Sequence, residues 1–246
     1  MADVNVNLAD IVIQLSNVQF EETVLRFSQF LTFKNPQYRF ALSKQRVQEE
    51  FDLLSNTYAK RIITYPEAEF NALYQDLPVC LWEDKVVLFH GVLISLDDSG
   101  YLFTAPSGVG KSTHAGLWKS YFKERAEIIN GDKILLRVKD DGLWGYGSPW
   151  KGKENIGNSS SVRLKAICLL ERGRDNVLIP LGKKAASNYG WLIEQVMLKN
   201  RQEEILRLIQ WLKNAIEYVD LYQLHCNMKI EAAITAYNGM NNLMHG

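Results

Sequence analysis

The sequence predicts an α/β protein with a sheet core flanked by helices, and three observations support that class. Short apolar segments typical of strands recur between residues 86 and 170, and apolar positions at helical spacing dominate residues 184–243. A glycine-rich loop also joins a buried strand to a helix near residue 105. With 246 residues, the chain can form one large domain or two small ones. We expect a core over residues 85–246, with an α+β portion over residues 1–84 packed on it.

The N-terminal portion has a mixed pattern. Alternating or β-branched apolar positions predict strands at residues 8–15 and 37–43. The segment 21–33 between them is compatible with either a helix or an apolar hairpin. Apolar residues at helical spacing predict helices at residues 44–56 and 67–75. None of these segments carries recognisable chemistry, so the sequence does not indicate the role of this portion.

The core begins with a predicted long strand at residues 86–96, broken or bulged near Gly91. The remaining pattern alternates short apolar segments with turn residues before becoming mainly helical. We expect strands at 101–104, 126–130, 134–138, 143–146, 164–170 and 221–225, and helices at 111–122, 184–198, 202–218 and 229–243.

Composition narrows the class of protein. The 28 Lys and Arg residues balance 28 Asp and Glu residues, which argues against binding to nucleic acid or to an acidic membrane surface. No apolar run approaches the ~18 residues of a membrane span, and the N-terminus lacks a signal-peptide pattern. The three cysteines are widely separated in apolar surroundings, as expected for reduced core residues. These features predict a cytoplasmic location.

Residues 105–112, with the sequence Ala-Pro-Ser-Gly-Val-Gly-Lys-Ser, follow the P-loop pattern except that alanine replaces its first glycine. Glycines allow several backbone N–H groups to approach phosphate, and the following helix presents its positive end to the same anion. The lysine can neutralise phosphate charge, and the serine hydroxyl can ligate Mg²⁺. A tight strand-to-helix turn without a ligand is the alternative. The predicted nucleotide-binding residues are Ser107, Gly108, Val109, Gly110, Lys111, Ser112 and Thr113.

A triphosphate site also needs a carboxylate for the metal, usually at the end of a neighbouring strand. Asp132 follows the predicted strand at 126–130 and fits this requirement, so Ser112 and Asp132 are the predicted metal ligands. The alternative is an ordinary turn aspartate. Four other aspartates lie in turn sequences and are expected to be solvated: Asp97, Asp98, Asp140 and Asp141.

A second glycine-rich loop spans residues 147–161. We expect Lys151, Gly152 and Lys153 to face the polyphosphate or the acceptor, with Trp150 anchoring the loop. A mobile surface loop is the alternative. Four further side chains outside this loop have predicted roles. Arg163, with Arg172 as a second choice, clamps the phosphate, His114 caps or packs its helix, and His225 lies in the core.

Several of these motifs, in this order, resemble one known family. Residues 88–113 (LFHGVLISLDDSGYLFTAPSGVGKST) resemble the catalytic domain of HPr kinase/phosphorylase. Residues 129–137 and 147–173 resemble small HPr-kinase-related proteins of the phosphoenolpyruvate-carboxykinase-like superfamily. The resemblance covers about residues 85–175 and extends more loosely to the end of the chain. It implies a phosphoenolpyruvate carboxykinase-like mixed β-sheet core with a P-loop, and binding of ATP and Mg²⁺.

The resemblance also implies roles for individual residues. Lys111, Ser112 and Thr113 match the family's phosphate and metal positions, and His90 matches a histidine beside the transferred phosphate. The family's paired aspartates correspond here to Gly131 and Asp132, and Thr113 replaces its usual glutamate. The missing aspartate counts against HPr-kinase activity itself, although phosphoryl transfer depends chiefly on positioning and charge. The predicted catalytic residues are His90, Asp132 and Lys111.

These inferences leave three functional hypotheses. The first is a kinase that uses ATP and Mg²⁺ to phosphorylate a hydroxyl of a small molecule, peptide or protein. The second is a non-catalytic nucleotide-binding regulatory module. The third, decarboxylation like that of phosphoenolpyruvate carboxykinase, is less favoured because the chain is short for that chemistry. In each case the expected partners are a nucleotide and, for a kinase, an unidentified phosphoryl acceptor.

Overall fold

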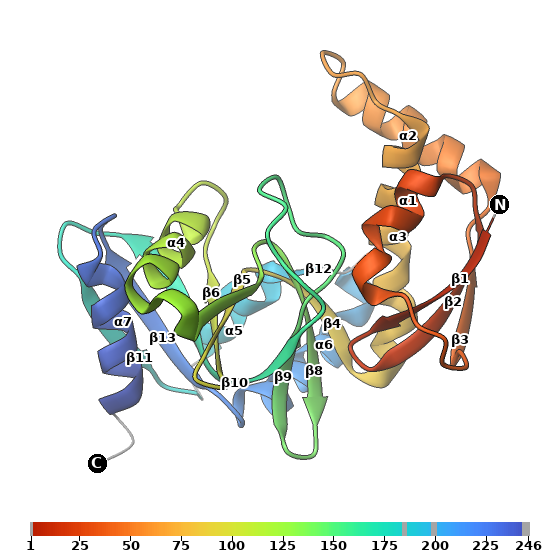
Figure 1. The fold of residues 1–246 in the computed structure, drawn as a ribbon. Helices are drawn as coiled ribbons and strands as arrows, with labels where there is room; N and C mark the ends of the chain where they lie inside the picture. The colour runs from red at the N-terminus through yellow and green to blue at the C-terminus, as the bar shows by residue number, and fades with distance from the viewer. Residues whose placement is uncertain (1, 184–185, 198–200, 243–246) are drawn as a thin grey trace. The chain divides into compact units, whose positions relative to one another are not determined.

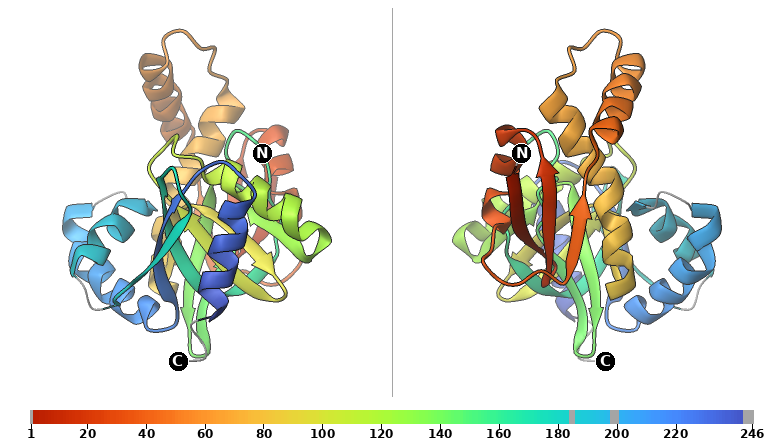
Figure 2. Two further views of the ribbon diagram at one scale, coloured as in Figure 1. Left: turned by 90° about the vertical axis from the view of Figure 1, so that its left-hand side faces the viewer. Right: turned by 90° about the vertical axis from the view of Figure 1, so that its right-hand side faces the viewer.

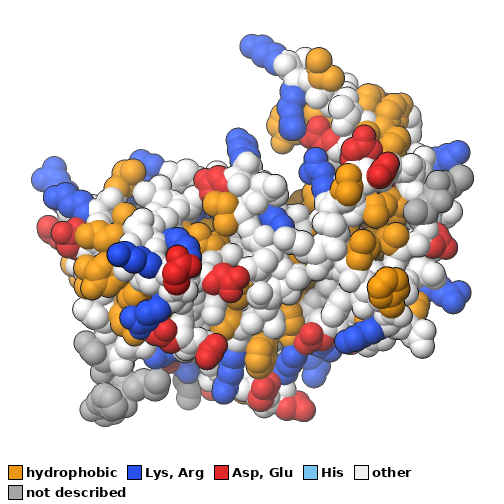
Figure 3. Space-filling model, viewed as in Figure 1, with side chains coloured by type: hydrophobic (Ala, Val, Ile, Leu, Met, Phe, Trp, Pro, Cys, Tyr) orange, Lys and Arg blue, Asp and Glu red, His pale blue; other side chains and the backbone are white. Residues whose placement is uncertain are grey.

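The computed structural model describes residues 2–183, 186–197 and 201–242, and it divides the chain into two compact units, Met1–Val86 and Val87–Gly246. Figure 1 shows the order of the elements along the chain. Within the described ranges, no helix has both the length and the apolar character needed to cross a membrane. Figure 3 shows basic and acidic side chains interspersed on the face in view, as the balanced charge predicts.

The N-terminal unit contains a three-stranded sheet. Strands β1 (Ala2–Leu8) and β2 (Ile11–Val18) form an antiparallel hairpin, and β3 (Tyr38–Ala41) pairs parallel to β2. The prediction of one strand over residues 8–15 is wrong, because Ala9 and Asp10 form a turn with φ values of 53° and 64°. Asp10 is of a residue type common in turns, but a single polar residue between apolar ones is also compatible with one continuous strand.

Helices make up the rest of this unit, as Figure 1 shows: α1 (Glu21–Arg26), the short η1 (Ser28–Phe30), α2 (Lys44–Thr57), α3 (Tyr65–Leu81) and the short η2 (Trp82–Asp84). The segment that sequence left as helix or hairpin is therefore helical. The hydroxyls of Ser43 and Thr64 cap α2 and α3 by accepting backbone N–H groups three residues on. Both helices confirm the predictions, although α3 is longer than expected because Pro78 lies within it without ending it.

The second unit is built on a large mixed sheet of ten strands among the described residues. Its main path runs β12-β4-β8-β9-β10-β6-β5-β7, and β13 and β11 continue from β10. The strands are β4 (Val86–His90), β5 (Val92–Leu96), β6 (Ser99–Thr104), β7 (Ala126–Asn130), β8 (Lys133–Lys139), β9 (Gly142–Tyr146), β10 (Ser161–Arg172), β11 (Val177–Leu181), β12 (Val196–Met197) and β13 (Asp220–Cys226).

The predicted long strand at 86–96 is divided at Gly91 into two strands with different partners. Strand β4 lies between β8 and β12, whereas β5 pairs with β6 and β7. A Cβ at Gly91 would lie 2.8 Å from the carbonyl oxygen of Phe103, so only glycine fits where the chain changes neighbours. Strands β11 and β12 were not predicted. Strand β12 follows directly after α5 (Ala186–Gln195), within the predicted helix 184–198, of which residues 184, 185 and 198 lie outside the described ranges.

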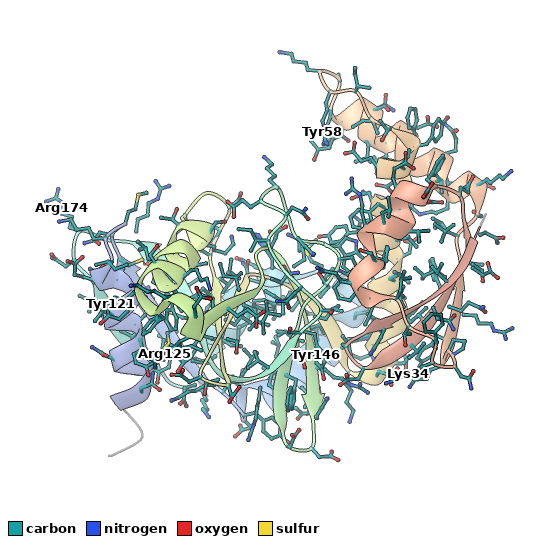
Figure 4. The ribbon with its side chains drawn as sticks, viewed as in Figure 1. Lys34, Tyr58, Tyr121, Arg125, Tyr146 and Arg174 are labelled. Atoms are coloured by element: carbon teal, nitrogen blue, oxygen red, sulfur yellow. The ribbon has the colours of Figure 1, made fainter. Side chains whose placement is uncertain are left out.

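The core of this unit lies between the sheet and two helices, α4 (Lys111–Phe122) and α7 (Glu231–Asn242), both at their predicted places. The indole of Trp118 is fully buried, with ring centroids of Tyr101, Phe103 and Phe122 4.9–5.2 Å away. Beyond α4, Arg125, which is labelled in Figure 4, forms an ion pair with Asp97 in the β5–β6 turn. Figure 2 shows α5 and α6 (Arg201–Ile216) as a pair set apart from α4 and α7.

Strands β6, β10 and β13 are parallel, and this pairing determines where the glycine-rich loop lies. In the register, Thr104 of β6 pairs with Leu169 of β10, and Arg172 of β10 pairs with Cys226 of β13. The carboxyl ends of the three strands therefore meet at one edge of the sheet. Ligands bind most often at such an edge in open α/β sheets, and the glycine-rich loop leaves β6 there.

Candidate functional site

A pocket of about 530 Å³ lies at this edge, where β4 and β6 end. Four separate chain segments line it: His90, residues 107–113 without Val109, the Gly131–Asp132 turn, and residues 151–154. The structure thus brings together most of the residues that the sequence singles out. These are His90, Ser107, Gly108, Gly110, Lys111, Ser112, Thr113, Asp132, Lys151, Gly152 and Lys153.

The glycine-rich loop leads directly into α4. Gly110 caps the helix with a φ of 125°, a conformation that favours glycine, and its carbonyl accepts the His114 N–H at 2.9 Å. Lys111 begins the helix and is only 9% exposed, and its Nζ donates to the carbonyl oxygen of Ala105 at 2.9 Å. Burial lowers the pKa of Lys111, while the nearby Asp132 carboxylate opposes that shift. A lysine held this way at the positive end of a helix favours an anion in the pocket.

Asp132 lies in the turn between β7 and β8. The side-chain oxygen of Asn130 accepts the backbone N–H groups of Asp132 and Lys133 at 2.9 Å each, which fixes the turn. The carboxylate has two cationic or polar neighbours: Nε2 of His90 lies 3.2 Å from Oδ1, and Nζ of Lys133 lies 3.0 Å from Oδ2. Burial opposes ionisation of Asp132, but these hydrogen bonds and the charge of Lys133 outweigh it, so the pKa is lowered.

The position of His90 follows from the end of β4. The N–H of Gly91 donates to the carbonyl oxygen of Asp132 at 2.9 Å, which ties the end of β4 to the β7–β8 turn. The hydroxyl of Thr104 donates to the carbonyl oxygen of His90 at 2.8 Å and ties the same point to β6. The histidine is therefore fixed by its backbone on both sides, while its imidazole remains partly exposed to the pocket.

The second loop, between β9 and β10, is fixed against the Asp132 turn by its backbone. The N–H of Gly131 donates to Ile156 O, and the N–H of Asn158 donates to Ile129 O, both at 3.0 Å. These bonds argue against the alternative of a mobile surface loop. Trp150, the expected anchor, is buried.

Gly152 is the point of closest approach between this loop and Asp132. With a φ of 72°, its backbone passes so near that a Cβ would lie 2.7 Å from the Cβ of Asp132. The flanking lysines are thereby placed at the pocket beside the carboxylate. Partial burial lowers the pKa of Lys151.

Two predicted residues do not reach this pocket. Val109 lies on the other side of the loop, where it lines a second pocket. Arg163 pairs with Trp144 near the start of β10, six residues before Leu169, which pairs with the end of β6. At about 3.3 Å per residue, that separation is roughly 20 Å. The structure therefore does not bring Arg163 to the pocket.

Arg172, the second choice for a phosphate clamp, lies at the end of β10 and contacts the glycine-rich loop from its far side. Its Nη2 donates to the carbonyl oxygen of Gly108 at 2.6 Å, and its Nε lies 3.4 Å from that of Val109. It therefore holds the loop rather than lining the pocket with Lys111.

Sequence reasoning missed two charged neighbours of the site. Glu154 lines the pocket as a second carboxylate, and Lys133 contacts Asp132 directly. Glu154 directly follows Lys153 in the second loop, and Lys133 directly follows Asp132, so adjacency in the sequence was the only signal for either residue. In the parts of the chain that the structure describes, no three His, Cys, Asp or Glu side chains form a group that could hold a metal alone.

The remaining predicted residues lie apart from the pocket. The four turn aspartates are exposed, as predicted: Asp97, Asp98, Asp140 and Asp141. Asp97 also pairs with Arg125, and Asp141 accepts the indole N–H of Trp144. His114 is buried, as expected for a packing residue. His225 is partly exposed beside Glu171, so its predicted core position is wrong. All three cysteines, Cys80, Cys168 and Cys226, are free thiols.

No protein-family model matches the chain, and no curated protein matches it in sequence. Among solved structures, it is similar to the HPr(Ser) kinase/phosphatase from Coxiella burnetii, with a TM-score of 0.37 and 11% identity, over 65% of this chain and 99% of that one. This similarity is distant, and it assigns no role to any residue of the site.

Proposed function

We propose that the protein is a Mg²⁺- and ATP-dependent kinase that transfers the γ-phosphoryl group to a hydroxyl of a small molecule, peptide or protein. One observation supports this most. A single pocket combines Lys111 at a helix N-terminus, the His90–Asp132 pair and the lysines of a second loop. Such an arrangement supplies cationic groups for phosphate and a proton acceptor beside them, which is what phosphoryl transfer requires.

Lys111 and the backbone of the glycine-rich loop would bind the polyphosphate. In the structure, Lys111 donates to the loop's own carbonyl at Ala105, so a phosphate oxygen would replace that acceptor. Lys151 and Lys153 line the opposite side of the pocket and would neutralise charge on the transferred group. Together these side chains would hold the phosphate in a fixed orientation for in-line attack.

The residues present fit a Mg²⁺ ion bound together with a nucleotide. The hydroxyl of Ser112 and the carboxylate of Asp132 line the same pocket, and both offer the hard oxygen ligands that Mg²⁺ prefers. One or two protein ligands are sufficient because phosphates and water complete the shell. When bound, the metal would neutralise charge on the phosphates.

His90 and Asp132 would handle the proton of the acceptor hydroxyl. Their 3.2 Å separation allows a proton to be shared between them, and Lys133 stabilises the carboxylate. Either residue could accept the proton directly, with the other stabilising the charge that results.

A second function is favoured by the same contacts. Because Asp132 already interacts with both His90 and Lys133, it is less available than a free carboxylate to a metal or a proton. This observation favours a non-catalytic module that binds nucleotide and signals its presence.

Incubation with γ-labelled ATP, Mg²⁺ and a cell extract tests the two functions against each other. A kinase transfers label to an acceptor, and the transfer disappears in Lys111→Ala but persists in Lys119→Ala, a lysine of the same helix outside the pocket. Binding of ATP without transfer to any species would support the binding module. Absence of binding would contradict both functions.

A further inference from the structure

A second pocket, of about 590 Å³, lies across the glycine-rich loop from the first. The two pockets share Gly108, Gly110 and Thr113, so only the loop and the first turn of α4 separate them. The second pocket is completed by the carboxyl ends of β10 and β13 and by the segment after β13. None of the residues of the β7–β8 turn or of the second loop lines it.

The walls of this pocket differ in chemistry from those of the first. Apolar side chains dominate it: Val109, Leu117, Leu170, Cys226 and Met228. It has two charged side chains. Arg172 lies at the end of β10, and Lys229 lies in the segment that follows β13. A concave, mainly apolar surface with a few polar groups is typical of sites that bind a flat organic ring.

His114 adds a polar atom to this apolar wall. Its Nε2 accepts the indole N–H of Trp118 at 3.0 Å, so the ring proton of the neutral imidazole must be on Nδ1. Burial holds the pKa of His114 at about 4, which keeps the ring neutral. Nδ1 is buried and has no hydrogen-bond partner, a costly arrangement that a ligand acceptor atom would relieve.

Arg172 fixes the wall that both pockets share. Its guanidinium donates to the carbonyl oxygen of Gly108 and lies near that of Val109, from the side of the second pocket. Because the peptide group is planar and trans, a carbonyl held toward Arg172 turns the N–H of the same peptide away from it. The N–H of Gly110, a residue that lines both pockets, therefore points away from Arg172.

We propose that the second pocket binds the base and ribose of the nucleotide whose phosphates occupy the first pocket. This inference rests on the proposed function. A nucleotide has a charged end, the phosphates, and a flat, mostly apolar end, the base. The charged lining of the first pocket matches the phosphates, and the mainly apolar lining of the second pocket matches the base. The glycines at the boundary have no side chain that would block a ligand from passing between the pockets. The volume suits a nucleoside, since small-molecule sites usually span roughly 300–1,000 Å³.

The test compares ligands that carry one or both ends: ATP, inorganic tripolyphosphate and adenosine, each titrated by calorimetry in the presence of Mg²⁺. Leu117→Trp fills the second pocket from α4, and Met228→Trp fills it from the opposite wall at a largely exposed position that tolerates substitution. Tyr121→Trp is the matched control, because Tyr121 is exposed one turn further along α4 and does not line the pocket (Figure 4).

We expect ATP to bind the unmodified protein at least about tenfold more tightly than tripolyphosphate does. Either filling variant should weaken ATP binding by about tenfold and abolish adenosine binding, with tripolyphosphate affinity changed less than about twofold. The control should leave all three unchanged.

Equal affinity for ATP and tripolyphosphate, or ATP binding unaffected by both filling variants, would overturn the second pocket while leaving the proposed function intact. If the unmodified protein binds neither phosphate ligand, the proposed function fails. The adenosine titration then tests the second pocket by itself. Adenosine binding that is lost in both filling variants would support a nucleoside site there, and absence of adenosine binding to the unmodified protein would overturn it.

Discussion

The two pockets on either side of the glycine-rich loop differ in chemistry although they share part of the same backbone. On one side, Lys111, Lys151 and Asp132 bring charges from three separate segments to one place. On the other side, Leu117 and Leu170 form an apolar wall. The difference arises from the neighbouring elements: the β7–β8 turn and the second loop supply polar groups, while the ends of β10 and β13 continue the apolar core. A loop with little side chain can thus separate two environments.

The two sides also treat their titratable groups differently. On the polar side, opposite charges support one another: the Asp132 carboxylate counteracts the effect of burial on the pKa of Lys111, and Lys133 and His90 lower the pKa of Asp132 despite its burial. On the apolar side, His114 has no such charge partner, and burial alone lowers its pKa to about 4. The polar side is therefore expected to stay charged near neutral pH, whereas His114 on the apolar side is expected to stay neutral.

The largest expected effect is on the polar side. Lys111→Ala should weaken ATP binding at least about 100-fold, because it removes charge-assisted hydrogen bonds worth roughly 3 kcal/mol in total. Calorimetry with the Lys119→Ala control measures the loss. Unchanged affinity would show that the loop does not bind phosphate.

The next effect concerns acid stability on the apolar side. The pKa of His114 is about 4 in the folded protein against 6.5 when exposed, so between these values the unfolded state binds more protons. Stability is then complete above pH 6.5 and falls as the pH decreases toward 4. Between pH 7.5 and pH 5, we expect His114 to contribute a loss of about 2 kcal/mol.

Urea denaturation of the unmodified protein and of His114→Phe at both pH values measures this contribution. The variant should lose that part of the pH dependence, whatever its absolute stability. Equal pH dependence in the two proteins would show that His114 is not kept neutral by burial.

A smaller effect distinguishes the contribution of Mg²⁺ to ATP binding from that of the direct phosphate contacts on the polar side. Asp132→Asn should reduce the Mg²⁺-dependent gain in ATP affinity by about tenfold, since a neutral amide is a weaker Mg²⁺ ligand. Binding without Mg²⁺ should change little. Titrations with and without Mg²⁺ test this, with Asp140→Asn as a control in a turn outside the pocket. An unaltered Mg²⁺ titration would assign the metal to another carboxylate, with Glu154 the first candidate.

The smallest effect distinguishes chemistry from binding within the polar pocket. His90→Ala should lower turnover by about fivefold, less than a sole proton acceptor would cause, because Asp132 remains to take the proton. ATP affinity should stay within about twofold. Steady-state kinetics separates kcat from KM, and His225→Ala provides a histidine control far along the sequence. A fall in affinity with unchanged turnover would make His90 a binding residue.

The sequence by itself predicted the parts of the site whose signal is local. Glycines at fixed spacing before a lysine and a hydroxyl predicted the loop from β6 to α4, because backbone freedom and helix start are properties of adjacent residues. The same holds for most strands and helices of the core. It failed at the Ala9–Asp10 turn, because the apolar residues on both sides of Asp10 fit the alternation of one continuous strand.

Only the tertiary structure decided which distant segments meet. Both Arg163 and Arg172 belong to β10, but the structure places them differently. Arg163 lies near the start of the strand, about six residues from the end that meets the pocket, and Arg172 contacts the glycine-rich loop. The tertiary structure also brought Glu154 to the first pocket and formed the second pocket from three segments that are far apart in the sequence, residues 108–117, 170–173 and 226–229. The physical reason is that strand register and loop contacts are set by the packing of the whole sheet, which the pattern of neighbouring residues does not specify.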